Sequence, residues 1–346
     1  MLDALPQPAV LATSAASYLA APAAGRRVTA WLEFPAARAT SPDAVARRRA
    51  DRLVITNRDG RRVQVVYDGG CSPAQPCDTV AAPHAGADTV LYAVADGQHA
   101  NIASASLLRR PSRLVAQMAQ PAGGVPPPYT LAGPEAVWYT ASALRERPPN
   151  ISEPARTLID APTGGPVRAV ARREPVTAWL GRTATGQDAV FEQLDGGRVA
   201  LLYSEVRPGV RLTSLALLDG GRVAVVAVRT AAGARTASVL LVTPRQPEPS
   251  VLVASVPSPR AFAYNPTISS FGHGVAFRRR IGSERGLADQ IVVIDVLRST
   301  SRVVASARLR AARLSDPSLG FGRVVWSEAQ IAGTRLVRSR VLSTPA

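Results

Sequence analysis

The residues that could carry out catalysis are few in this sequence, and their spacing matches no catalytic motif. Its three histidines, His84, His99 and His273, stand far apart, each without a cysteine or carboxylate at metal-ligand spacing. The sequence also contains no nucleophile-elbow serine, no His-Glu-x-x-His pair and no phosphate-binding glycine loop. We therefore expect the histidines on surfaces or in loops, and the sequence predicts no catalytic residue, no metal site and no cofactor.

The two cysteines, Cys71 and Cys77 in CSPAQPC, are the second feature with chemical potential. Five residues separate them, two of which are proline, and no further cysteine or histidine cluster completes a zinc site. This spacing favours a small disulfide-closed loop over two unpaired surface thiols, and a disulfide is typical of an oxidising compartment. We expect an extracytoplasmic protein (secreted, periplasmic or at the cell surface), although its first 25 residues do not resemble a signal peptide.

The basic charge of the chain comes from arginine alone. The net charge is +16, and all 41 basic residues are arginines spread along the whole sequence. Proteins that bind nucleic acid usually mix lysine with arginine in a dense stripe with aromatic residues, and aromatic residues make up only 5% here. Codon bias is a simple source of the charge, so nucleic acid is not an expected partner. No apolar run is long enough for a membrane-spanning helix.

A repeat in the sequence predicts the elements that must position these residues. The string VTAWL begins at Val28 and again at Val176, and similar apolar runs begin at Val90, Val137, Val223, Val275 and Val324. The intervals average about 49 residues, and seven of them approximate the 346-residue chain. A period of this length, with several strands in each repeat, is typical of a β-propeller.

The strand signals within each repeat predict the shape of a blade. The sixth repeat contains four apolar runs separated by turn residues, PTISSFG, HGVAFRR, QIVVIDVL and SRVVAS. The last repeat shows three runs, so the N-terminal run Ala9–Ser14 is expected to supply its outer strand and close the ring. The fold class is therefore all-β, a seven-bladed propeller of four-stranded antiparallel blades, which fits the period better than six or eight blades. We expect an N-terminal segment (1–17) with the closing strand, a single propeller domain (18–346), and a monomer.

The recurrence of VTAWL also has a packing explanation. The two copies would be the second strands of blades 1 and 4, covered on both faces by neighbouring blades, which favours a continuous apolar run over strict alternation. Trp31 and Trp179 are then expected to pack between blades, with Trp138 and Trp326 at matching positions.

Three stretches resemble the TolB-like and WD-repeat-like β-propeller group: SLALLDGGRVAVVAVR, ISSFGHGVAFRRR with the following QIVVIDVLRSTSRVVA, and DPSLGFGRVVWSEA. The resemblance implies a periplasmic or secreted scaffold that binds a partner without catalysis. The alternative is a propeller enzyme of hydrolase or lactonase type, because carboxylates from distant repeats can converge at the mouth of a central channel.

A basic face is the candidate binding surface from sequence. The long connections 35–50, 142–154 and 279–289, interpreted as loops between second and third strands, would share one face with the cysteine loop, 68–78. They carry the candidate anion-binding residues Arg47, Arg48, Arg49, Arg145, Arg147, Arg279, Arg280 and Arg285, together with Arg38. Arginine forks suit carboxylate and phosphate groups, so a protein or an anionic envelope polymer is the expected partner. The alternative is that these arginines are solvated and bind nothing.

Overall fold

The structure is a computed structural model. It describes residues 7–35, 52–69, 79–95, 98–119, 126–149, 153–246, 248–259, 264, 266–283, 286–333 and 335–346. These residues form strands and turns, with a short 3₁₀ helix, η2 (Asp219–Gly221), and without an α-helix. A helix long and apolar enough to cross a membrane is not found among them.

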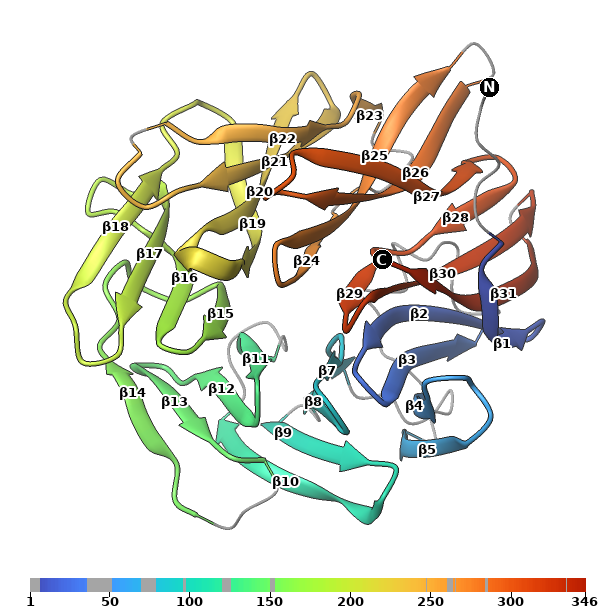
Figure 1. Cartoon of the computed structure of the whole chain (residues 1–346), viewed down its shortest axis with the longest axis horizontal. Coiled ribbons are helices and arrows are strands. Elements are labelled where there is room, and N and C mark those ends of the chain that lie inside the picture. The colour runs from blue at the N-terminus through green and yellow to red at the C-terminus, as the bar shows by residue number, and fades with distance from the viewer. Residues whose placement is uncertain are drawn as a thin grey trace.

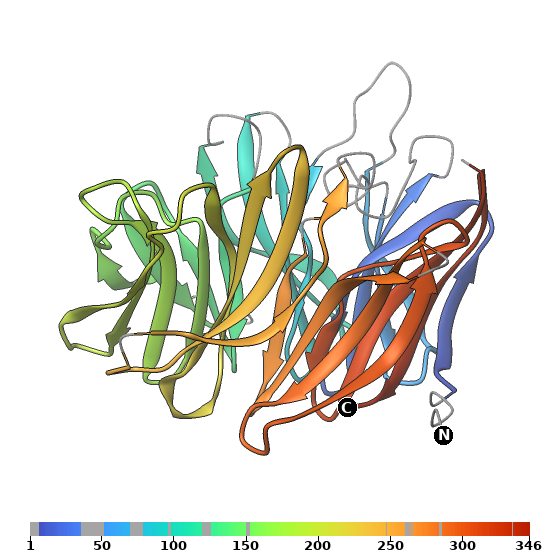
Figure 2. The ribbon, with the colours of Figure 1, turned by 90° about the horizontal axis from the view of Figure 1, so that it is seen from above.

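Seven antiparallel sheets are arranged radially around one axis, and each sheet is a blade of a β-propeller (Figures 1 and 2). The first strand of each blade lies nearest the axis and contacts the first strands of its two neighbours. This arrangement confirms the predicted seven-bladed fold of four-stranded blades.

The strands follow one another in chain order from the axis outward. Blade 1 contains β2 (Ser17–Ala24), β3 (Val28–Pro35), β4 (Arg52–Asn57) and β5 (Val63–Asp68). Blade 2 begins with two short strands, β6 (Thr79–Val80) and β7 (His84–Ala85), and continues with β8 (Thr89–Ala95), β9 (His99–Ser106) and β10 (Arg109–Ala119). Blade 3 contains β11 (Tyr129–Ala132), β12 (Glu135–Tyr139), β13 (Ala143–Arg147) and β14 (Arg156–Asp160). Blade 4 contains β15 (Ala169–Arg173), β16 (Val176–Arg182), β17 (Asp188–Leu194) and β18 (Val199–Ser204).

The remaining blades follow the same plan. Blade 5 contains β19 (Val210–Leu217), β20 (Val223–Ala231), β21 (Ala234–Val242) and β22 (Ser250–Ala254), with β23 (Ser258–Pro259) paired to β21. Blade 6 contains β24 (Ile268–Phe271), β25 (Gly274–Ser283), β26 (Gly286–Asp295) and β27 (Thr300–Arg308). Blade 7 contains β28 (Ala312–Leu314), β29 (Ser318–Gly320), β30 (Arg323–Ala332) and β31 (Arg335–Pro345). The seven apolar runs found in the sequence are the second strands of the blades.

The N-terminal strand closes the ring. Strand β1 (Ala9–Ser14) pairs antiparallel with β31, so that Ala9 lies opposite Ser343 and Ser14 opposite Ser339. Figure 1 shows this as the blue start of the chain lying against its red end. The predicted closing strand is confirmed with its predicted bounds, and it completes blade 7, which would otherwise leave an unpaired edge.

Each second strand buries both of its faces. On β20, Val225 packs into a cluster shared with blade 4, whereas the adjacent Val226 packs into a cluster shared with blade 6. In the described part of the chain the buried apolar side chains form seven clusters, each centred on one interface between blades. The continuous apolar runs follow from this two-sided burial, as predicted.

The four tryptophans lie at these interfaces, each at most 3% exposed. Trp31 packs toward blade 7, Trp138 toward blade 2, Trp179 toward blade 3 and Trp326 toward blade 6, so that each faces the preceding blade in the ring. Their predicted packing role is confirmed.

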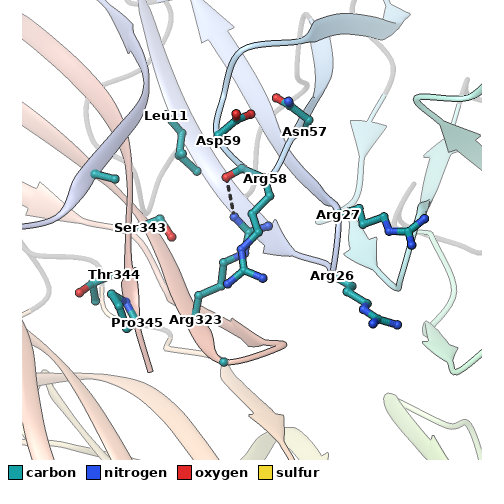
Figure 3. Close-up of a pocket in the computed structure, with 12 residues that line it drawn as sticks. Leu11, Arg26, Arg27, Asn57, Arg58, Asp59, Arg323, Ser343, Thr344 and Pro345 are labelled. Carbon is teal, nitrogen blue, oxygen red and sulfur yellow. Dashed lines mark hydrogen bonds between the residues drawn. The ribbon is translucent and has the colours of Figure 1, made fainter.

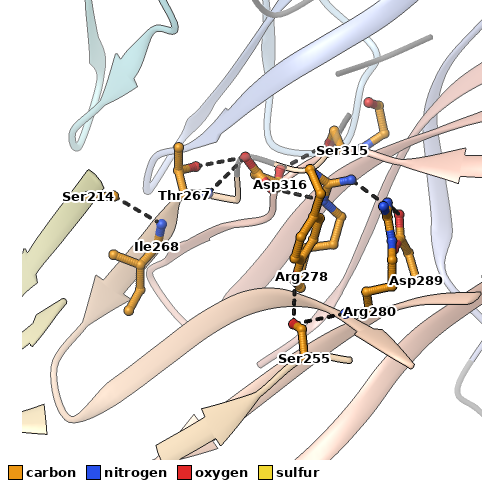
Figure 4. A network of polar contacts seen from close by, with 11 residues as sticks. Ser214, Ser255, Thr267, Ile268, Arg278, Arg280, Asp289, Ser315 and Asp316 are labelled. Atoms are coloured by element: carbon orange, nitrogen blue, oxygen red, sulfur yellow. Dashed lines mark hydrogen bonds and ion pairs between the residues drawn. The ribbon is translucent and has the colours of Figure 1, made fainter. Parts of the chain in front are cut away.

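A buried charge network links blades 5, 6 and 7 (Figure 4). The Asp289 carboxylate accepts hydrogen bonds from Arg280 Nε at 2.8 Å and from Arg278 Nη1 at 3.2 Å. Arg278 Nε also donates to Asp316 of blade 7 at 2.9 Å. Asp289 and both arginines are at most 1% exposed, and the Tyr264 ring lies 4.4 Å from the Arg280 guanidinium carbon.

This network corrects the prediction that 279–289 is a loop. Strand β25 continues through Ser283, so Arg279 and Arg280 are strand residues, and Arg280 lies opposite Asp289 in the β25–β26 ladder. The charged run looked like a solvated loop because charges seldom enter a strand that is buried on both faces. Here Asp289 neutralises the arginine charge within the sheet.

The prediction that 142–154 is a long loop between the second and third strands is also wrong. The turn between β12 and β13 is short, because the Thr140 hydroxyl donates to the carbonyl of Ala143 at 2.9 Å and the strand resumes there. Arg145 and Arg147 therefore lie on β13. Arg147 is the last residue of that strand, at the end away from the β12–β13 turn. The structure does not gather these two arginines with Arg279 and Arg280 on one loop-rich rim.

The other candidate residues of that rim, Arg47, Arg48, Arg49, Arg285 and Arg38, lie outside the described residues, as do Cys71 and Cys77. The disulfide and the anion-binding role of those loop arginines stay predictions.

We predict that replacing two equivalent tryptophans by phenylalanine has unequal effects. The Trp179 indole N–H donates to the Thr163 carbonyl at 2.9 Å, whereas the Trp326 indole N–H is buried with no partner among the described residues. Trp179→Phe leaves a carbonyl without its donor, but Trp326→Phe removes an unsatisfied donor. Trp179→Phe should therefore lower the free energy of unfolding in urea by about 1–2 kcal/mol more than Trp326→Phe. Equal losses would contradict the hydrogen-bond assignment.

We predict that Asp289 is the carboxylate whose neutralisation most weakens blade 6. Asp289→Asn leaves the buried Arg280 guanidinium without a counter-charge and Arg278 with Asp316 alone, and breaking a buried pair in this way costs about 3–5 kcal/mol. The matched control is Asp295→Asn on the same strand, because Asp295 pairs with the exposed Arg298 at 3.8 Å and surface pairs contribute about 0–1 kcal/mol. Urea unfolding measures both variants, and a loss at Asp289 no larger than that at Asp295 would refute the assignment.

Candidate functional site

The ends of the seven first strands enclose a cavity of about 1000 Å³ on the axis of the propeller. Its wall takes residues from β2, β7, β11, β15, β19, β24 and β29, and from the turns that join several of these strands to the second strands. The volume is that of a typical small-ligand or side-chain pocket. The cavity is therefore the candidate functional site, and its mouth lies on the face formed by the first-to-second-strand turns.

His84 lines this cavity and corrects an expectation from the sequence. It lies on the first-strand position of blade 2, not in a surface loop, and its ring packs edge-on against Tyr129 of blade 3 with centroids 5.0 Å apart. Burial lowers the pKa of His84 from its ordinary 6.5 to about 4, so the imidazole is neutral at physiological pH. His99 lies on β9 and His273 in the β24–β25 turn, so the three histidines do not converge.

Three carboxylates near the mouth, Asp88, Glu174 and Asp219, pair with basic side chains. Asp88 lies 3.6 Å from Arg27, which links blades 1 and 2. Glu174 lies 3.7 Å from the buried Arg172. These pairs place fixed charges of both signs around the opening.

Asp219 is the third of these paired acids. Its carboxylate pairs with Arg173 of blade 4 and lies 3.6 Å from His273 Nε2 of blade 6. The Asp219 backbone N–H also donates to the Gly272 carbonyl at 3.0 Å. The turns at the mouth are thus tied together across blades, which favours a rigid rim.

Two phenylalanines stand at the edge of the cavity. Phe271 ends β24 and is 43% exposed, and its ring lies 4.7 Å from that of Phe321 on blade 7. Phe321 and Gly322 form the two-residue turn between β29 and β30, with φ of 51° and 75°. Such turns favour Asn, Asp or Gly at the first position, since a bulky residue with positive φ is strained. The fold therefore holds an aromatic ring at the mouth against local backbone preference.

One local pattern in the sequence points to this site. Within SLGFGRV, the two glycines indicate a turn. The phenylalanine between them occupies a turn position at which glycine and small polar residues are preferred. Its neighbour Phe271 comes from a segment 50 residues earlier, so only the ring geometry brings the two together. Among the described residues, no group of three or more His, Cys, Asp or Glu side chains could hold a metal ion.

We predict an acid-dependent loss of stability that requires His84. The pKa of His84 is about 4 in the folded state and near 6.5 when unfolded, so below pH 6.5 the unfolded chain binds a proton that the folded chain does not. The destabilisation from this group is absent above pH 6.5 and grows as pH decreases from about 6.5 to 4. His84→Gln should flatten the decrease of the urea midpoint over this range, whereas His273→Gln should retain it. An unchanged slope in His84→Gln would refute the burial of this imidazole.

No protein-family model matches the sequence, and no curated protein matches it either. Solved structures do match its fold. The β-propeller domain of the Trilobed protease from Pyrococcus furiosus is similar with a TM-score of 0.56 and 10% identity, over 95% of this chain and 95% of that chain. The BP39L lectin from Burkholderia pseudomallei is similar with a TM-score of 0.54 and 10% identity, over 96% of each chain.

TolB from Acinetobacter baumannii is also among the similar structures, with a TM-score of 0.49 and 12% identity over 88% of this chain. The chain spans 62% of the length of that TolB. Identities this low show a shared fold alone. The matches with TM-scores of 0.56 and 0.54 confirm the β-propeller architecture that the repeats predicted.

Proposed function

We propose that the protein is a non-catalytic binding module that holds an apolar side chain of a partner protein in the mouth of its central channel. The observation that carries the proposal is the aromatic pair of Phe271, which is exposed, and Phe321, which is half-buried, at the edge of a cavity of about 1000 Å³. Exposed aromatic residues beside a pocket are typical anchors of protein interfaces.

The strained turn supports a binding role for Phe321. Positive φ at a bulky residue costs about 1–3 kcal/mol, and such strain clusters at ligand-binding sites. Asparagine would fit the turn better, so the backbone conformation does not account for the phenylalanine at this position. The apolar wall around the pair, which includes Leu131, Leu217 and Leu319, would receive a leucine or aromatic side chain.

The paired charges support recognition over proton transfer. A general acid or base needs a carboxylate or imidazole free to exchange a proton with the ligand. Asp88, Glu174 and Asp219 instead pair with arginines, and such fixed charges would orient a polar peptide backbone or side chain around the anchor.

The alternative is a propeller enzyme at the same mouth, and one observation favours it. His84 is a neutral imidazole on the channel wall, the form in which histidine can accept a proton. The solved propellers of similar fold include a lectin and a protease domain, so the fold is compatible with binding and with catalysis. Loss of binding in a His84 variant without loss in the phenylalanine variants would favour this alternative.

The extracytoplasmic location belongs to the proposal as well. It rests on the expected disulfide of Cys71 and Cys77.

We predict that Phe321→Asn weakens partner binding without weakening the fold. Peptides selected from a random 12-residue display library on the wild-type protein should carry a leucine or aromatic anchor. Phe271→Ser and Phe321→Asn should each weaken those peptides at least tenfold, about 1.4 kcal/mol, because the anchor loses its aromatic contact. The urea midpoint of Phe321→Asn should equal or exceed that of the wild type, since asparagine relieves the turn.

The control variant is Leu108→Ser, which removes a side chain 73% exposed in the β9–β10 turn, away from the channel. It should leave every selected peptide unaffected. Selected peptides that bind Phe271→Ser and Phe321→Asn as tightly as the wild type would refute the proposed site.

A further inference from the structure

A second cavity of about 820 Å³ lies at the seam of the ring, where blade 7 meets blade 1 (Figure 3). Its wall takes residues from the start of β1, the β2–β3 turn, the β4–β5 turn, the start of β30 and the end of β31. The two ends of the chain and the first and last sheets therefore share one cleft. This cleft is separate from the central channel.

A buried arginine without a counter-ion forms part of its wall. Arg323 is 3% exposed, and its guanidinium donates to the carbonyls of Gly25 at 3.0 Å, Val28 at 2.9 Å and Arg58 at 3.1 Å. It also donates to the Thr29 hydroxyl at 2.7 Å. Its Nε is buried and has no hydrogen-bond partner in the described part of the chain. Buried arginines are normally paired with a carboxylate. The Arg323 Nε–H is therefore a charged donor that lacks a hydrogen-bond partner among the described residues.

A second positive charge lies next to the first. The side chains of Arg58 and Arg323 lie close together in Figure 3, and burial together with the charge of Arg58 lowers the pKa of Arg323 to about 10. Arg323 still carries its charge at neutral pH. Two cations held side by side repel each other unless an anion joins them.

The nearby carboxylates do not neutralise this pair. Asp59 lines the cleft, but its carboxylate forms an ion pair with Arg61 at 3.4 Å. The Asp88 carboxylate forms an ion pair with Arg27 at 3.6 Å. Within the described residues, neither Arg58 nor Arg323 forms an ion pair. The cleft therefore carries an excess of positive charge in a chain whose net charge is already +16.

The number of cations at the cleft indicates the charge of the anion that fits it. Two guanidinium groups match a dianion, whereas a single carboxylate would neutralise only one of them.

We propose that the seam cleft is a binding site for a tetrahedral oxyanion, the phosphate group of a small molecule or free phosphate, held by Arg58 and Arg323. Because these residues come from blades 1 and 7, the anion bridges the two blades. It binds the closed ring and not the unfolded chain, so its occupancy stabilises the fold.

The test measures binding of inorganic phosphate to the full chain by titration calorimetry and its effect on Tm at constant ionic strength. Phosphate should bind and raise Tm relative to chloride, and acetate should bind more weakly because it carries one charge. A parallel titration with glycerol 3-phosphate distinguishes the sources: tighter binding than inorganic phosphate indicates a phosphate ester, and weaker binding indicates the free ion.

Variants separate a site from a general salt effect, since phosphate also stabilises proteins by exclusion from their surface. Arg58→Gln should weaken phosphate at least tenfold and remove most of the rise in Tm. The matched control is Arg198→Gln, an exposed arginine in the equivalent third-to-fourth-strand turn of blade 4, which should change neither. Phe271→Ser should also bind phosphate normally, because it alters only the channel mouth.

Two results would overturn the proposal. One is a titration in which phosphate produces no binding heat and no rise in Tm beyond that of chloride. The other is an equal response of Arg58→Gln and Arg198→Gln to phosphate, which would assign the stabilisation to exclusion from the surface.

Discussion

Every blade of this propeller has two apolar faces, and neither can be left in water. The second strands place alternate residues in the two flanking clusters, as Val225 and Val226 do, so each sheet depends on both neighbours. Such an arrangement is stable only as a closed ring. The pairing of β1 with β31 meets this requirement with backbone hydrogen bonds between the two ends of the chain. Side chains reinforce the seam, where Ser339 accepts from the Leu19 backbone N–H at 3.0 Å and Arg323 donates to carbonyls of blade 1.

The same packing explains where the arginines can be tolerated. A charge inside a two-sided sheet loses its hydration, and only a well-placed counter-charge offsets that cost. Asp289 does so for Arg278 and Arg280, and Glu146 does so for Arg172 between blades 3 and 4. Part of the basic composition is therefore structural. These arginines are unavailable to a partner, which removes them from any surface electrostatic argument.

Two cavities remain on the face formed by the first-to-second-strand and third-to-fourth-strand turns. They differ in chemistry, since the channel mouth presents Phe271 and Phe321 among paired charges, whereas the seam cleft presents Arg58 and Arg323 without a counter-ion. Both are built on strands that are packed on two sides, which holds their side chains in place. The solved propellers of similar fold include a lectin and the β-propeller domain of a protease, so the fold by itself does not identify a ligand.

The period of the apolar runs determined the number of blades, the order of the strands and the closing strand Ala9–Ser14. Strands that are buried on both faces, and the strand that closes the ring, must be apolar, so local hydrophobicity reveals them. Local sequence patterns gave wrong loop predictions where charged side chains lie in strands. Arg145 and Arg280 looked like loop residues, but a short turn at Thr140 and the counter-charge of Asp289 keep them in strands. The meeting of Phe271 with Phe321, and of Arg58 with Arg323, was decided by the tertiary structure alone. Residues that are 50 or 265 positions apart become neighbours only when the ring closes, and no local preference of the chain encodes that contact.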